Sequence, residues 1–153
     1  MSFGHLAHAK PSLEVTVVTG SHADVVAFTA GGAITAGDVV AFDVAGQTGE
    51  DQTSTVIQAA ADSHAAIGVA LEAITAGEAT AGAPVRVCVS GYIEGVNCLG
   101  AAGGFVQGSP AKISGAGAGR VDLNTAGSIG PVLGVALDAP SGNVVTMYLY
   151  RQY

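Results

Sequence analysis

Histidines are the first side chains in this chain that could bind a metal. His5 and His8 lie three residues apart, and His22 and His64 follow at longer intervals. Zinc needs about three or four such ligands on a rigid frame. The stretch around His5 and His8 has neither helical nor strand periodicity, so it offers no such frame. Solvated or interface histidines are the simpler interpretation, and we expect no metal and no other cofactor.

Carboxylates are the second candidate for chemistry, since two neighbouring acids can share the roles of general acid and base. The candidates are Asp38, Asp43, Glu72 and Asp138. Glu72 and Asp138 each end an expected strand just before a turn. An acid in that position commonly accepts hydrogen bonds from backbone N–H groups. We therefore expect these carboxylates to be structural.

Motifs for nucleophilic catalysis and phosphate binding are absent from the sequence. There is no Gly-x-Ser-x-Gly elbow, and no neighbouring residue would activate Cys88 as a thiolate. Residues 115–119 are glycine-rich but lack the Gly-Lys-Ser/Thr ending of a phosphate loop. Cys88 and Cys98 could pair across a short loop or remain free, and we expect free, partly buried thiols. The chain is not expected to be an enzyme.

Charged residues are scarce. They make up 11% of the 153 residues, while 49% are hydrophobic, and an ordinary globular protein has roughly 25% charged residues. Depletion of charge marks the buried centres of interfaces. The composition therefore predicts a homo-oligomer or an assembly-bound protein.

The balance of charge argues against nucleic acid as a partner. Twelve acidic residues oppose five basic ones, for a formal net charge of -7, and the basic residues form no cluster. Binding to duplex DNA requires several basic groups on one face. No apolar run reaches the about eighteen residues of a membrane span, and the start lacks the features of a secretory signal, so no membrane association is expected.

Short runs with period-two alternation predict strands almost throughout the chain. The clearest are 13–18, 25–28, 39–44, 85–89, 92–96, 111–113, 120–123 and 144–150. A helical turn near 58–63 is the only helix expected. Many short strands separated by turns are typical of a β-sandwich or barrel. We expect an all-β fold, with residues 1–12 as an extended N-terminal arm and 13–153 as one β-rich domain.

One segment of the chain is repeated. Residues 67–73, Ile-Gly-Val-Ala-Leu-Glu-Ala, return at 133–139 as Leu-Gly-Val-Ala-Leu-Asp-Ala. The flanking segments match as well, 37–42 with 108–113 upstream and 82–89 with 141–149 downstream. Because two copies are too few for a solenoid, we expect one compact domain with internal pseudo-duplication, in halves of about 33–95 and 104–150.

Several of these segments resemble a known family. Residues 33–40, the paired 67–71 and 133–137, and 84–91 resemble the capsid decoration, or cement, proteins of tailed bacteriophages. The similarity covers most of residues 13–150 and is carried by Gly, Ala and Val around turns. It implies a β-tulip-like or related β-barrel fold and a homotrimer made in the bacterial host cytoplasm. It also implies a place on the outer surface of the virion capsid, where the trimer binds the major capsid protein and stabilises the shell.

The N-terminal arm is the expected docking element. Phe3 and Leu6 are its only sizeable apolar side chains, and His5, His8 and Lys10 accompany them. An extended arm can add a strand to the edge of a partner's sheet. We expect these five residues to bind the capsid.

Two other functions fit the sequence less well. A carbohydrate-binding or adhesive β-module on a virion surface needs exposed aromatic rings, and the chain has no Trp and only Tyr92, Tyr148, Tyr150 and Tyr153. The second alternative is a small trimeric β enzyme. Residues 119–122, Gly-Arg-Val-Asp, resemble the uracil-binding hairpin of trimeric dUTPases, but the tyrosine expected after it and an Arg-Ser-Ser stretch are missing.

Overall fold

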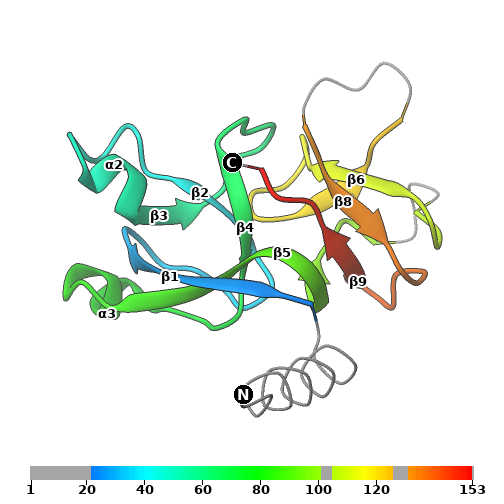
Figure 1. The fold of residues 1–153 in the computed structure, drawn as a ribbon, viewed down its shortest axis with the longest axis horizontal. Coiled ribbons are helices and arrows are strands. Elements are labelled where there is room, and N and C mark those ends of the chain that lie inside the picture. Colours follow the sequence, from blue (N-terminus) through cyan, green and yellow to red (C-terminus); the bar gives the residue numbers. More distant parts are fainter. Residues whose placement is uncertain (1–21, 101–104, 126–130, 153) are drawn as a thin grey trace, which may run out of the picture.

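Strands dominate the structure, a computed structural model that describes residues 22–100, 105–125 and 131–152 (Figure 1). Strands account for 46% of the described residues and helices for 7%, which confirms the all-β prediction. The expected arm at 1–12 and the expected strand at 13–18 lie outside the described residues. The elements follow in the order β1 (Asp24–Ala30), β2 (Val39–Phe42), α2 (Asp51–Ser54), β3 (Thr55–Gln58), β4 (Ala66–Ala70), α3 (Ala76–Thr80), β5 (Pro84–Asn97), β6 (Pro110–Ile113), β7 (Val121–Leu123), β8 (Val132–Ala136) and β9 (Val144–Leu149).

The first five strands form a closed barrel. They neighbour one another in the order β1, β3, β2, β4 and β5, and β5 pairs again with β1 to close the ring. Only the β1–β3 pairing is parallel. The interior is filled mainly by small β-branched side chains: Val40, Val56, Ile67, Val85, Val87 and Val89. We call residues 24–90 the first barrel, and it confirms the predicted barrel architecture.

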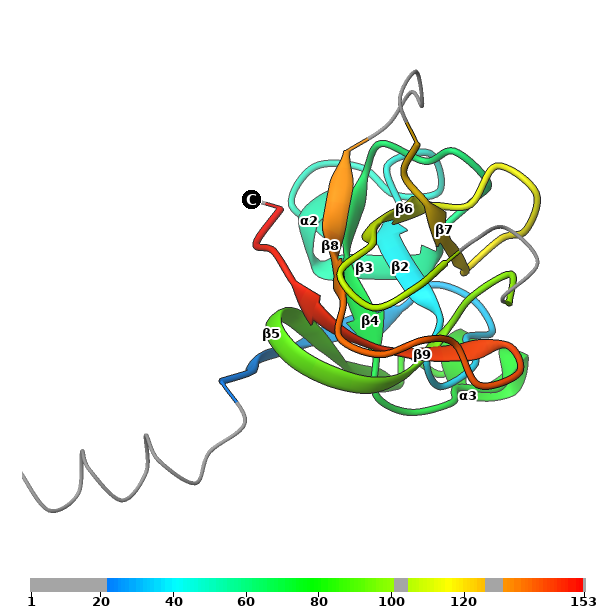
Figure 2. The same cartoon turned by 90° about the vertical axis from the view of Figure 1, so that its right-hand side faces the viewer.

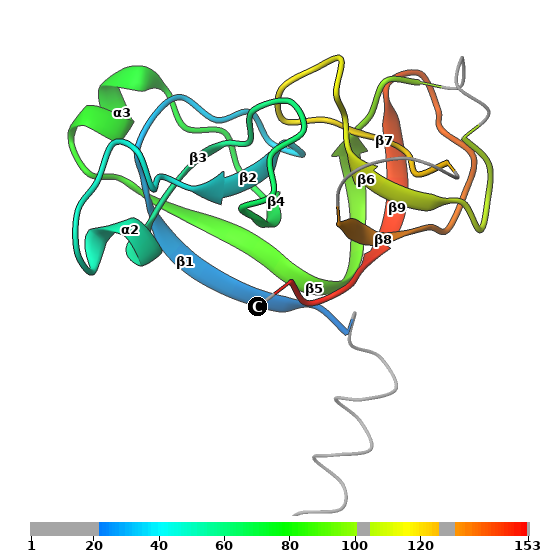
Figure 3. The same cartoon turned by 90° about the horizontal axis from the view of Figure 1, so that it is seen from above.

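Strand β5 also belongs to a second group of strands. It is 14 residues long, and beyond Ser90 it pairs with β9 instead of β1. β8, β6 and β7 follow β9 in the sheet. A parallel bridge between Cys98 and Val121 brings the chain just after β5 back to β7. We call residues 91–149 the second barrel; Figures 1 and 3 show the two barrels side by side, with β5 running along both.

The two barrels repeat each other strand by strand. In the first, Val40 pairs with Gly68 and the register shifts immediately afterwards. In the second, Ala111 pairs with Gly134 and the register shifts at the same place. β2, β3, β4 and the front of β5 therefore correspond to β6, β7, β8 and β9. The pairing confirms the internal duplication, and halves defined by it begin at β1 and at Gly91, earlier than the expected ranges.

Gly91 sits where β5 leaves the first barrel for the second. Its φ is 98°, a conformation that L side chains rarely adopt. A Cβ atom at this position would also collide with the backbone of His22 and Ala23. Glycine therefore permits both the bend of β5 and the close approach of the chain that leads into β1.

Both described helices are short and lie where only loops were expected. α3 begins with a capping box: the Thr75 hydroxyl accepts from the Glu78 N–H at 3.3 Å, and the Glu78 carboxylate accepts from the Thr75 N–H at 2.8 Å. The expected helical turn at 58–63 is wrong. Gln58 ends β3, and Asp62 has a left-handed φ of 55°, which interrupts any helix. No helix in the described ranges is long and apolar enough to cross a membrane.

Candidate functional site

The residues expected to bind the capsid cannot be placed. Phe3, His5, Leu6, His8 and Lys10 all lie outside the described residues. The remaining candidates are the carboxylates, the thiols, the junction of the two barrels and the exposed tyrosines.

Glu72 and Asp138 occupy equivalent positions and bind backbone, as expected. Glu72 Oε1 accepts from the Arg86 N–H at 2.8 Å, and Asp138 Oδ1 accepts from the Thr146 N–H at 2.9 Å. The hydrogen bond from the Arg86 backbone is the main cause that lowers the pKa of Glu72, and hydrogen bonds from Thr146 lower that of Asp138. The two acids thus fasten one strand pair in each barrel instead of facing each other as a catalytic pair.

Asp38 lies at the junction of the barrels and is 4% exposed. Its Oδ2 accepts from the Thr35 N–H at 3.0 Å and from Gln58 Nε2 at 2.7 Å. Its Oδ1 accepts from Asn97 Nδ2 at 2.8 Å. Because Asn97 ends β5 inside the second barrel, the carboxylate ties the two barrels together. Asp43 instead bonds within its own loop, where it accepts a hydrogen bond from the Gly46 N–H at 2.8 Å.

A polar hollow of about 360 Å³ opens beside Asp38, lined by Thr35, Asp38, Gln58, Asn97, Ala118, Arg120 and Asn143. Gln58 and Asn97 both donate to the Asp38 carboxylate there. The β6–β7 hairpin forms part of the wall: the Gly119 N–H donates to Ala59 O and Gly119 O accepts from the Val39 N–H, each at 2.8 Å. The hairpin that resembles a uracil-binding segment therefore also joins the barrels.

Neither a metal centre nor a reactive thiol is formed by the described residues. His22 and His64 are both exposed. Within the described ranges, no three His, Cys, Asp or Glu side chains gather closely enough to hold a metal ion. Cys88 and Cys98 are free and each 1% exposed, more deeply buried than expected. Burial raises the pKa of both thiols, so their nucleophilic thiolate form is disfavoured.

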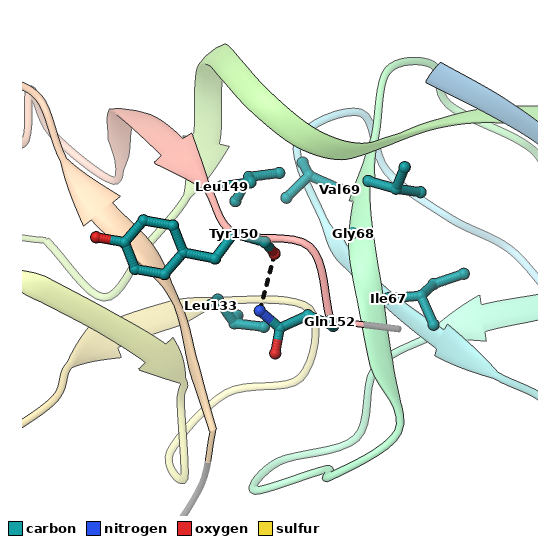
Figure 4. Close-up of a pocket in the computed structure, with 8 residues that line it drawn as sticks. Ile67, Gly68, Val69, Leu133, Leu149, Tyr150 and Gln152 are labelled. Atoms are coloured by element: carbon teal, nitrogen blue, oxygen red, sulfur yellow. Dashed lines mark hydrogen bonds between the residues drawn. The ribbon is translucent and has the colours of Figure 1, made fainter. Parts of the chain in front are cut away.

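An apolar seam fills the space between the barrels (Figure 4). Ile67, Val69 and Val89 line one side, and Leu133 and Leu149 line the other. The space admits no water molecule. The C-terminal chain borders it, where Gln152 Nε2 donates to the carbonyls of Tyr150 at 2.8 Å and of Val132 at 3.1 Å. The seam is therefore packing, with no room for a ligand.

Three of the four tyrosines gather on the outside of the second barrel. Tyr92 pairs with Tyr148 across β5 and β9, and the rings of Tyr148 and Tyr150 are 6.4 Å apart. Their exposures are 38%, 41% and 46% respectively. The Tyr92 hydroxyl donates to the Glu94 carboxylate, a bond that is the main cause raising the pKa of Tyr92. Figure 4 shows the Tyr150 ring directed away from β4.

The same pairing register continues beyond the tyrosines. Tyr148 pairs with Val135 on β8, and Val135 pairs with Pro110 on β6. Val135 is half-buried and Pro110 is exposed. We call this surface, formed by Pro110, Val135, Tyr148, Tyr92 and Tyr150, the tyrosine face (the strands that carry it are seen in Figure 2). The sequence analysis noted the tyrosines, but only the strand register brings three of them together.

Comparison of the chain with protein-family models and with curated proteins finds no match.

Proposed function

We propose that this chain is a capsid decoration protein, which binds the outside of a tailed-phage head as a homotrimer and stabilises the shell. The tyrosine face is the observation that supports this proposal most directly. In a chain with 5% aromatic residues, three tyrosines share one exposed surface. Aromatic side chains are enriched in protein interfaces, where they supply much of the binding energy. The surface therefore suits a protein that works by association.

The proposed trimer gives weak contacts a combined strength. Three equal subunits offer three equal contacts, and binding of one raises the effective concentration of the others at the shell. The arm at 1–12, with Phe3, His5, Leu6, His8 and Lys10, remains the proposed contact with the major capsid protein. An arm that adds a strand to a neighbouring sheet gains affinity from backbone hydrogen bonds.

Cosedimentation with phage heads tests the proposal. Purified protein is mixed with undecorated heads, and the pelleted fraction is measured together with the temperature at which the heads release their DNA. We expect saturable binding and a higher release temperature. A variant with Phe3 and Leu6 changed to Ser should bind more weakly, whereas Val44→Ser, a change of an exposed side chain in a loop of the first barrel, should bind normally. Absence of wild-type protein from every pellet would contradict the proposal.

Carbohydrate binding is the second candidate, and the clustering of the tyrosines is the observation in its favour. Sugars stack on exposed aromatic rings, and three are available here. A glycan array with wild-type protein and Tyr148→Ala tests it. Binding lost in the variant would favour the carbohydrate-binding module over the decoration protein.

A further inference from the structure

The tyrosine face has a counterpart in the first barrel. Both barrels carry a row of directly paired residues across four neighbouring strands. These strands are β2, β4, β5 and β1 in the first barrel, and β6, β8, β9 and β5 in the second. In the first barrel the row is Val39, Val69, Cys88 and Val25. In the second barrel it is Pro110, Val135, Tyr148 and Tyr92. The strands correspond one to one, so the two rows occupy equivalent surfaces.

In the first barrel three of the four residues of this row are covered, while Val25, at its end, is 46% exposed. Val39 and Val69 are 0% exposed and Cys88 is 1% exposed. All three belong to the hydrophobic cluster that also fills the second barrel. Val69 faces Leu149 across the seam, and the Val39 N–H donates to Gly119 O of the β6–β7 hairpin. What covers these three residues is thus another barrel of the same construction.

In the second barrel the equivalent surface is open. Tyr148, which corresponds to Cys88, is 41% exposed, and Pro110, which corresponds to Val39, is also exposed. Within the described ranges no element packs over these side chains as the second barrel packs over the first. Removing exposed aromatic surface from water is favourable. An apolar sheet face of this kind is a candidate for association.

We propose that the tyrosine face is the self-association surface of this protein and that its occupant is a second copy of the chain. The inference rests on the proposed function, because it assigns a surface to the homo-oligomer. Two observations favour a second copy. Three of the four residues of the equivalent row are already covered by a barrel of this same fold. Tyr150 belongs both to the tyrosine face and to the lining of the seam, so the face continues an existing barrel-to-barrel interface.

A sugar fits this face less well than a protein. Sugars need hydrogen-bonding groups around the aromatic platform. The Tyr92 hydroxyl is already bound to Glu94, and Val135 and Pro110 contribute apolar surface. A mainly apolar row across four strands matches the buried centre of a protein interface better.

The test measures the mass of the oligomer and the hydrogen exchange of backbone amides, both on the full chain. Sedimentation velocity over a dilution series gives the oligomer as a multiple of the 14.9 kDa protomer and its dissociation constant. Tyr148→Glu places a charge at the centre of the face and should raise that constant at least about 30-fold. Val44→Glu adds the same charge at a side chain that is 56% exposed in the first barrel and should leave it unchanged. Circular dichroism verifies that both variants are folded.

Hydrogen exchange on unmodified protein provides an independent check if Tyr148→Glu fails to fold. Amides of β8 and β9 should exchange more slowly in the concentrated oligomer than after dilution. An oligomer that survives Tyr148→Glu, or a wild-type monomer at all concentrations, would overturn the inference. So would a monomer that binds glycans through Tyr148. If the variant dissociates but wild-type protein ignores phage heads, the surface is correctly assigned and the proposed function fails alone.

Discussion

The two barrels share their backbone scaffold and differ in what their outer faces meet. In each barrel a glycine, Gly68 or Gly134, allows two strands to approach closely. An acid at a strand end accepts a hydrogen bond from an N–H of the neighbouring strand. A polar side chain just before β2 or β6 accepts a hydrogen bond from a backbone N–H in the preceding turn. The outer face of the first barrel carries Val39, Val69 and Cys88 and is buried. The same face of the second barrel carries Pro110, Val135 and Tyr148 and is open. The backbone requirements repeat, whereas the side chains fit the surroundings of each copy.

The residues that cap the turn before the second strand make the same point. Asp38 and Ser109 are equivalent: each accepts a hydrogen bond from the backbone three residues earlier, at 3.0 Å in both barrels. Asp38 additionally binds Gln58 and Asn97 across the junction. Either side chain can accept the hydrogen bond from the backbone of the turn. The additional bonds to Gln58 and Asn97 use both oxygens of the Asp38 carboxylate.

The largest expected effect tests the shared scaffold. A Cβ at Gly68 would clash with the Cys88 carbonyl oxygen, and one at Gly134 with the Tyr148 carbonyl oxygen. Gly68→Ala and Gly134→Ala should therefore each lower the free energy of unfolding by about 3 kcal/mol, measured by urea denaturation. Gly77→Ala in α3, where a Cβ meets no atom, should be neutral or slightly stabilising. A large difference between the first two variants would break the equivalence of the barrels.

The next effect tests the difference between the capping residues. Asp38→Ala removes the carboxylate that accepts from the Thr35 N–H, Gln58 and Asn97, and it should cost about 2 kcal/mol of unfolding free energy. Ser109→Ala removes one acceptor and should cost about 1 kcal/mol. Thermal and urea unfolding measure both. Asp38→Asn, which keeps one acceptor oxygen, should lie between them. Equal losses for Asp38→Ala and Ser109→Ala would show that the junction bonds contribute nothing.

The smallest expected effect is the pH dependence of the stability that Glu72 and Asp138 contribute. The pKa of Glu72 and of Asp138 is lowered in the folded protein. Each therefore contributes stability above its unfolded pKa near 4, and the contribution is lost as pH falls through the folded pKa. Because both acids are well solvated, Glu72→Gln and Asp138→Asn should each cost less than about 1 kcal/mol at pH 7 and less still at an acidic pH below the unfolded pKa. Unfolding free energies at the two pH values provide the measurement. A cost that grew as pH fell would contradict the assignment.

The sequence predicted the fold well where the pattern was local. Alternating Val85, Val87 and Val89 indicated the inner row of β5, and the repeated Gly-Val-Ala-Leu segments indicated β4 and β8. The helices at Asp51–Ser54 and Ala76–Thr80 were missed, because one or two turns carry too little periodicity.

The candidate site was less predictable. The tyrosine face depends on which strands lie side by side: Tyr92 and Tyr148 are 56 positions apart and meet only through the β5–β9 register. The Asp38 junction likewise depends on Asn97, which lies 59 residues away. The backbone roles of Glu72 and Asp138 were predicted correctly because they follow from a local feature, an acid at the end of a strand just before a turn.

Strand β5 belongs to both barrels as one continuous covalent path. A force that pulls the barrels apart would therefore act on the backbone of β5. It would also shear the hydrogen bonds of β5 with β1 and β9, so the seam could not separate alone. The same continuity means that a break in the chain near Gly91 would turn one molecule into two fragments held together by non-covalent contacts, among them the seam, the Asp38 bonds and the Gly119 backbone bonds. Cleavage or circular permutation at that point would measure how much of the mechanical integrity of this protein comes from its single shared strand.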